Sequence, residues 1–179
     1  MDKRKFRYPY IVITGPESTG KTELAAQLAQ NLNCRWIPEL SRDYIANLGR
    51  PYQYADVERI ARLQIARFTN ELMPESAFAV FDTGLIITKV WFDVVYKKCP
   101  DWLIEAIQQQ PKVFHLVCNT DLPWIADPVR ENGGAMREKL LETYQYELKG
   151  FGFPHALVSG NAELRLQNAL KLLKQHLIL

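Results

Sequence analysis

The stretch ITGPESTGKTELA, residues 13–25, decides the fold of this chain. A short, mostly β-branched apolar run from Tyr10 precedes it, and apolar residues at helical spacing continue from it to Leu32. Between these two halves the sequence matches the pattern G-x-x-x-x-G-K-[ST] in full, with Gly15, Pro16, Glu17, Ser18, Thr19, Gly20, Lys21 and Thr22. Strand, glycine loop and helix in this order are the context that the pattern requires. The sequence therefore predicts a loop that binds phosphate groups.

The chemistry of such a loop follows from its backbone. Glycines let the chain wrap closely, so that successive N–H groups and the positive end of the next helix face a polyphosphate. We expect Lys21 to reach the β and γ phosphates of a nucleotide and the Thr22 hydroxyl to ligate Mg²⁺. The alternative is a glycine turn with an incidental lysine. The motif leaves open whether the γ phosphate passes to water, to a small molecule or to a protein.

Composition limits the remaining possibilities. A chain of 179 residues fits one domain over residues 1–179. A net charge of +2 is too small to imply nucleic acid as a partner, and no stretch has the length of a signal peptide's apolar region or of a membrane span. We therefore expect a cytoplasmic protein with neither nucleic acid nor membrane as partner. Widely spaced cysteines predict free thiols, and no side-chain metal site is expected from Cys34, Cys99, Cys118, His115, His155 and His176.

Alternating strands and helices predict the fold class. Five apolar runs read as strands, at residues 10–15, 34–39, 77–84, 112–119 and 155–160. The helical patterns between and after them cover residues 22–32, 41–48, 56–72, 85–96, 101–109, 135–149 and 162–177. This alternation predicts parallel pairing with right-handed crossovers, hence an α/β three-layer sandwich around a five-stranded parallel sheet. Ligands of such sheets bind at the carboxyl ends of the strands.

Several polar residues follow the predicted strands. Asp82 ends the third strand, where a carboxylate can hold a magnesium-bound water or act as a base for an acceptor hydroxyl; the alternative is that Asp82 or Thr83 caps the next helix. Glu39 and Arg42 follow the second strand and would face the cleft, to bind sugar hydroxyls and phosphate, or else form a surface ion pair.

The segment from 121 to about 137 is a candidate lid, because residues 121–134 show no clear periodicity. It contains Trp124, Asp127 and Arg130. An arginine on a closing lid neutralises charge that develops as a γ phosphate leaves, and Arg137 is a second candidate for this role. The alternative is a surface loop with a tryptophan that packs against the core.

Four segments, in this order, resemble the ribosylnicotinamide kinase part of NadR-like proteins: TGPESTGKTELA, PELSRDYI, FDTGLIITKVW and LPWIADPVRE. The resemblance covers nearly the whole chain. It implies a P-loop NTPase fold like that of nucleoside kinases, with ATP and Mg²⁺ as cofactors and the ribose hydroxyl of nicotinamide riboside as acceptor. By resemblance, residues 15–22 bind ATP, Asp82 lies at the magnesium and acceptor position, and Arg130 belongs to the lid.

The resemblance also implies which residues would bind the acceptor nucleoside. Glu39 and Arg42 would face the substrate, with Asp127 on the same side. The nicotinamide ring is cationic and favours aromatic faces, so Tyr52, Tyr54 and Trp124 would stack on it; ordinary core packing is the alternative for each.

Two departures from the family pattern limit what the resemblance implies. No HxGH-type motif of an adenylyltransferase domain occurs in the sequence, so we expect the kinase part alone. Gly84 stands where an acidic or amide residue would touch the substrate. Two functions therefore stay open: a kinase of a small nucleoside, and a P-loop ATPase that switches conformation and regulates a protein partner.

Overall fold

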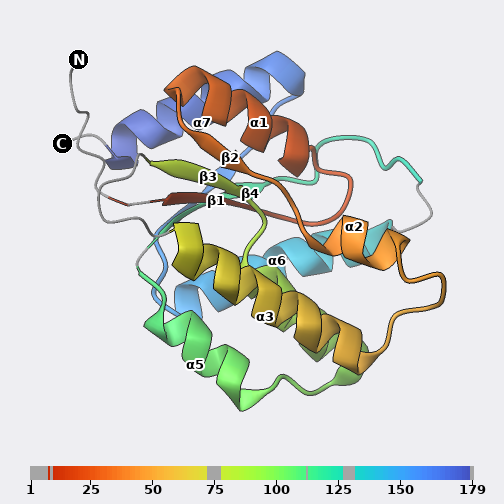
Figure 1. Cartoon of the computed structure of the whole chain (residues 1–179). Helices are drawn as coiled ribbons and strands as arrows, with labels where there is room; N and C mark the ends of the chain where they lie inside the picture. Colours follow the sequence, from red (N-terminus) through yellow and green to blue (C-terminus); the bar gives the residue numbers. More distant parts are fainter. Residues whose placement is uncertain (1–7, 9, 72–77, 112, 127–131, 178–179) are drawn as a thin grey trace.

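A five-stranded sheet, with every strand parallel, forms the centre of the computed structural model (Figure 1). The structure describes residues 8, 10–71, 78–111, 113–126 and 132–177. The strand order is β2-β3-β1-β4-β5. The strands are β1 (Tyr10–Thr14), β2 (Arg35–Ile37), β3 (Ala79–Asp82), β4 (Phe114–Cys118) and β5 (His155–Val158). The predicted parallel α/β sheet is confirmed.

Helices cover both faces of this sheet (Figure 1). One layer consists of α1 (Lys21–Leu32) and α7 (Ala162–Leu177). The opposite side holds α2 (Ser41–Ala46), α3 (Tyr54–Glu71), α4 (Leu85–Trp91), a π-helix η1 (Phe92–Tyr96), α5 (Asp101–Gln109) and α6 (Ala135–Gly150). Alternate residues of β1 serve the two layers, because side chains along a strand point to opposite faces. Tyr10 and Val12 belong to one apolar cluster, whereas Ile11 and Ile13 belong to the other. The three-layer arrangement is confirmed.

Several helix ends differ from the sequence prediction: α2, for example, ends at Ala46 and not at residue 48. The helix predicted from residue 56 begins at Tyr54, because Asp56 accepts a hydrogen bond of 2.7 Å from the Gln53 amide and thereby caps the first turn. Arg50 donates two further hydrogen bonds to the same carboxylate, at 2.7 and 2.9 Å. The helix predicted over residues 85–96 ends as predicted at Tyr96, before Lys97 with its φ of 53°, but its last turn, from Phe92, is a π-helix.

Burial keeps the three thiols and the His115 imidazole uncharged near pH 7. Cys118 is buried, and burial raises its pKa to about 11; burial likewise raises the pKa values of Cys34 and Cys99 to about 11. His115 is buried, and desolvation lowers its pKa to about 3, so that it stays neutral near pH 7. Among the described residues, no helix has the length and apolarity to cross a bilayer.

Gly84, at the start of α4, has no room for a side chain. An added Cβ would lie 2.9 Å from Val12 Cγ1 on the central strand and 3.5 Å from the Phe68 ring. We expect Gly84→Ala to lower the free energy of unfolding by about 1–3 kcal/mol, because the core must shift to admit the methyl group. Gly150→Ala is the matched control, since an added Cβ there meets nothing within 4 Å. Urea unfolding of both variants tests this; equal stability of the two would contradict it.

Candidate phosphate and acceptor site

The phosphate loop joins β1 to α1, and its two motif glycines occupy positions that other residues fit poorly. Gly15 has a φ of 145°, and an added Cβ would lie 2.9 Å from the carbonyl oxygen of Cys118 at the end of β4. Gly20 precedes α1 with a φ of 72°, in the left-handed region. The loop is therefore packed closely against the carboxyl end of the neighbouring strand, where ligands of parallel sheets bind.

Within the loop, the carbonyl of Pro16 accepts hydrogen bonds from two side chains. The Thr19 hydroxyl donates at 2.8 Å and the Lys21 ammonium at 2.7 Å. Lys21 is half-buried and folds back over the loop, whereas Thr22 is exposed on the first turn of α1. The lysine charge therefore lies over the loop backbone. The motif predicts that this backbone wraps a polyphosphate.

Asp82 is the buried acid of this region. Its side chain is 2% exposed, and neither carboxylate oxygen accepts a hydrogen bond from a described residue. Burial is the largest influence on the pKa of Asp82 and raises it. The nearby Thr22 hydroxyl lowers this pKa, although it does not reach hydrogen-bond geometry. The charge of Glu39 raises the pKa, and the charges of Lys21 and Arg42 lower it. The fold therefore brings four predicted site residues within electrostatic reach of Asp82.

The backbone after β3 argues against a capping role for Asp82. The residue that precedes α4 as its N-cap is Gly84, and no side chain caps the helix. Thr83 adopts a φ of 75°, which is strained for a residue with a side chain, and its amide donates a 3.1 Å hydrogen bond to the Ile13 carbonyl. The strained turn holds Asp82 at the strand end, beside the phosphate loop, and leaves its carboxylate without the capping contact.

These residues fit a magnesium ion bound through a nucleotide. In the described part of the chain, no group of three or more His, Cys, Asp or Glu side chains could hold a metal ion. Mg²⁺ commonly takes one or two protein oxygens and completes its shell with phosphate oxygens and water. The unpartnered Asp82 carboxylate and the Thr22 hydroxyl supply that number of protein oxygens.

The segment that carries Glu39 and Arg42 leads from β2 into α2. The Ser41 hydroxyl donates a hydrogen bond to Glu39, and Arg67 of α3 donates to the Pro38 carbonyl at 2.8 Å. Arg42 is exposed and Glu39 is half-buried.

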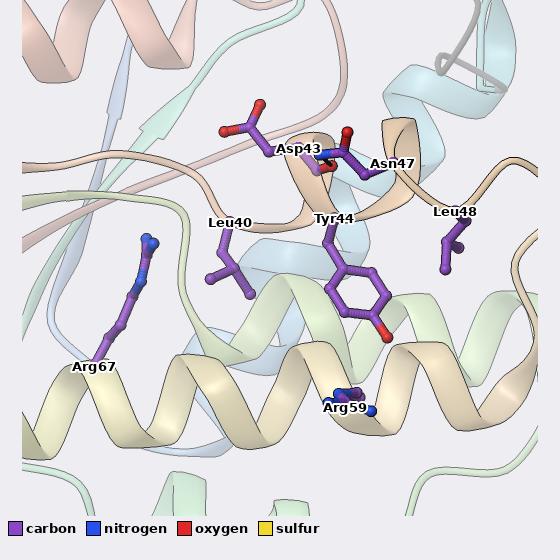
Figure 2. Close-up of a pocket in the computed structure, with 7 residues that line it drawn as sticks. All are labelled: Leu40, Asp43, Tyr44, Asn47, Leu48, Arg59 and Arg67. Atoms are coloured by element: carbon purple, nitrogen blue, oxygen red, sulfur yellow. Dashed lines mark hydrogen bonds between the residues drawn. The ribbon is translucent and has the colours of Figure 1, made fainter.

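A hollow of about 420 Å³ lies between α2 and α3 (Figure 2). It is lined by Leu40, Asp43, Tyr44, Asn47, Leu48, Arg59 and Arg67. Figure 2 shows the Tyr44 ring directed toward Arg59 on α3, with Asp43 directed away from that helix. The lining shares no residue with the phosphate loop or with the cluster of Glu39, Arg42 and Asp82.

The aromatic residues predicted to stack on a ligand have partners within the fold. Tyr52 lies edge-on to Trp91 with ring centroids 5.0 Å apart, and Tyr54 meets Phe92 at 5.0 Å. The Trp124 ring lies 5.7 Å from the Arg137 guanidinium. These contacts agree with core packing for the two tyrosines, and ligand stacking by any of the three stays a prediction. Asp127 and Arg130 lie outside the described residues.

The described flanks of the predicted lid contact the phosphate loop. The Ile125 amide donates to the Ser18 hydroxyl at 2.9 Å, and that hydroxyl donates to the Pro123 carbonyl at 3.3 Å. On the other flank, the Asn132 amide donates to the Glu17 carboxylate at 2.8 Å. Glu17 and Ser18, at positions where the motif allows any residue, therefore hold both flanks of the predicted lid next to the phosphate loop.

Sequence reasoning did not identify Arg165, a buried residue of α7 whose guanidinium bonds to the phosphate loop. A signal was present. Arg165, Ala169 and Leu173 lie four residues apart along α7, and the latter two belong to the buried face of that helix. An arginine in the apolar stripe of a helix indicates a buried charge that requires a partner.

Comparison with known proteins decides the family. The sequence model of the family described as "AAA domain" matches residues 10–165. The chain belongs to this AAA domain family. The domain is 29% identical, over 146 residues, to the Trifunctional NAD biosynthesis/regulator protein NadR of Salmonella typhimurium. The match covers 77% of this chain and 35% of that protein, so the chain spans about a third of the length of this curated relative.

Several solved structures have the same fold as this AAA domain. Two structures of NadR proteins, one in complex with NR and one with NAD and AMP-PNP, superpose with TM-scores of 0.73 and 0.72 at 18% and 19% identity. Both cover 93% of this chain, which spans 50% and 49% of theirs. Thymidylate kinase from Ehrlichia chaffeensis superposes with a TM-score of 0.67 at 10% identity, over 92% of this chain and 97% of its own. The P-loop fold and the NadR-like resemblance predicted from sequence are confirmed.

Proposed function

We propose that this AAA domain is an ATP- and Mg²⁺-dependent kinase that transfers the γ phosphate to the ribose hydroxyl of nicotinamide riboside or a related nucleoside. The observation that carries the proposal is the Asp82 carboxylate, which is buried and unpartnered among the described residues and lies near Lys21 and Thr22 of the phosphate loop. An ATPase that only hydrolyses ATP needs an oriented water, whereas a kinase needs a group that orients or deprotonates an acceptor hydroxyl.

Each residue of the loop has a distinct role in this proposal. The backbone amides of residues 15–22 bind the phosphates, and Lys21 exchanges its contact with the Pro16 carbonyl for the β and γ phosphate oxygens. Thr22 and Asp82 would hold Mg²⁺, which neutralises phosphate charge when it is bound. Asp82, whose pKa is raised by burial, accepts the hydroxyl proton as the ribose oxygen bonds to the γ phosphorus and the bond to ADP breaks.

The acceptor is inferred from the relatives and from the segment after β2. NR is bound by one of the NadR proteins of similar fold, and NAD biosynthesis is part of the name of the curated relative. Glu39 and Arg42 lie within electrostatic reach of Asp82, where a carboxylate binds sugar hydroxyls and an arginine binds phosphate. A single domain and a cytoplasmic location stay predictions from the sequence.

Arg130 keeps its predicted role on the lid. We expect Arg130→Ala to lower the maximal rate by roughly 10²- to 10³-fold at saturating ATP, because a lid arginine stabilises charge in the transition state. The affinity for the acceptor should change little. Steady-state kinetics with both substrates varied tests this prediction, and an unchanged maximal rate would remove Arg130 from the lid role.

ADP release from MgATP, measured across a panel of nucleosides, tests the function. Release should rise several-fold or more with nicotinamide riboside and stay low in a parallel reaction that lacks an acceptor. An Asp82→Asn sample run in parallel corrects for contaminating ATPase. Slow release that no nucleoside changes would reject the kinase and favour a P-loop ATPase that regulates a protein partner.

A further inference from the structure

Two buried arginines hold successive carbonyls of the phosphate loop. Arg137, in the first turn of α6, donates from Nη2 to the Ser18 carbonyl at 3.0 Å. Arg165, in the first turn of α7, donates from Nη1 to the Thr19 carbonyl at 3.1 Å. They are 6% and 2% exposed, respectively. Because α6 and α7 cover opposite faces of the sheet, the two guanidinium groups reach the loop from both outer layers (Figure 1).

The same guanidinium groups also bind the segment that follows β4. Both Nη atoms of Arg137 donate to the Leu122 carbonyl at 3.1 Å. Arg165 forms an ion pair with Asp121 and donates from Nε to the Gly160 carbonyl at 2.8 Å. Asp121 accepts a second hydrogen bond, of 2.6 Å, from the Gly160 amide. Arg137 therefore fixes the phosphate loop against the segment after β4, and Arg165 fixes it against the segments after β4 and β5.

The direction of these carbonyls determines the direction of the next amides. The C=O and N–H of a trans peptide unit point in opposite directions, and the described residues contain no cis peptide bond. The Ser18 carbonyl shares its peptide unit with the Thr19 amide, and the Thr19 carbonyl shares one with the Gly20 amide. Guanidinium groups that hold both carbonyls outward leave both amides directed away from the arginines, as an anion-binding loop requires.

The loop needs such support, because its backbone is strained. Ser18 has a φ of 57°, which is unfavourable for a residue with a side chain, and its own carbonyl is the one that Arg137 holds. Buried charges are themselves costly, and an apolar replacement of a buried ion pair often stabilises a fold. Two buried guanidinium groups at consecutive peptide units therefore point to a role in the site rather than to a contribution to stability.

We propose that Arg137 and Arg165 are positioning residues that aim the Thr19 and Gly20 amides at the nucleotide phosphates. This inference rests on the proposed function, since it concerns the ATP site of the same enzyme. The residues touch neither substrate. Their removal should weaken binding of the polyphosphate while the acceptor's KM stays unchanged.

The test separates positioning from stability by removing the whole buried pair. Arg165→Met alone leaves the Asp121 carboxylate unpaired, so Arg165→Met combined with Asp121→Asn is the informative variant. We expect this double variant to melt close to the wild-type temperature and to bind MgADP about tenfold or more weakly by calorimetric titration. Arg137→Met should weaken MgADP binding similarly. Arg50→Met combined with Asp56→Asn, which removes the ion pair at the first turn of α3, is the matched control and should leave MgADP affinity unchanged.

The outcomes distinguish this inference from the proposed function. Arg165→Lys keeps the charge but offers one nitrogen in place of the three that donate to Gly160, Thr19 and Asp121, and it provides a conservative variant if a methionine variant fails to fold. Wild-type affinity for MgADP in any folded variant at Arg165 or Arg137 would overturn the inference alone. A wild-type chain that does not bind MgADP would overturn the proposed function as well.

Discussion

Lys21→Ala should lower the rate of phosphoryl transfer by roughly 10²- to 10³-fold, the loss expected when a donor aimed at transition-state charge is removed. The ammonium lies over the loop backbone, where a transferred phosphate would place its developing charge in a partly buried site. The fold should survive, because the Pro16 carbonyl loses the hydrogen bond from Lys21 but still accepts one from the Thr19 hydroxyl. Steady-state rates and thermal melts of the purified variant measure the two effects.

The control for this variant is a lysine on the same side of the sheet. Lys171→Ala, on the exposed surface of α7, removes the same charge from the chain and should leave the rate unchanged. Full activity in Lys21→Ala would contradict the assignment of the phosphate loop. A loss of activity that coincided with loss of the native fold would contradict the expected stability.

Asp82→Asn should lower turnover by about 10²- to 10⁴-fold, the range of general acid–base contributions, while MgATP still binds. An amide cannot accept the acceptor's proton, whereas the phosphate loop and Lys21 remain intact. Single-turnover rates and nucleotide titrations separate the two effects. Equal losses in binding and in turnover would contradict the role of base and indicate a structural role for Asp82.

The same substitution should make the protein more stable. Asp82 buries a charge without a hydrogen bond from a described residue; an amide in its place also lacks a partner but carries no charge, so the melting temperature should rise. Since burial raises the pKa of the folded carboxyl, the gain of Asp82→Asn should be absent below the ordinary carboxyl pKa. It should grow as pH rises from there to the raised pKa and stay constant above it. Melts across pH that show no such gain would contradict this.

Local sequence patterns were sufficient to predict the architecture. A continuous apolar run such as Tyr10–Thr14 indicates a strand buried on both faces, and this one lies at the centre of the sheet. The glycine motif between that strand and α1 predicted a tight loop, and Gly15 is indeed held against the end of β4. The order of strands in the sheet was not predicted, since pairing depends on contacts between residues far apart in sequence.

The site was only partly predictable, for the same reason. Asp82 was identified because the end of a strand is a local feature, and the structure adds its burial and its missing partner. The hydrogen bonds of Arg137 and Arg165 to the loop join residues separated by 119 and 146 positions, a relation that spacing does not reveal. The glycine at position 84 is explained by packing, because Val12 occupies the space that a side chain there would need.

The measurement that tests the central claim most directly is the stoichiometry of products from MgATP and nicotinamide riboside. Mass spectrometry of a completed reaction gives the amounts of ADP, phosphorylated nucleoside and free phosphate together. We predict one phosphorylated nucleoside per ADP, with little free phosphate, and far less of this product from Asp82→Asn over the same reaction time. One free phosphate per ADP, with the nucleoside unchanged, would contradict phosphoryl transfer to the ribose hydroxyl and identify water as the acceptor.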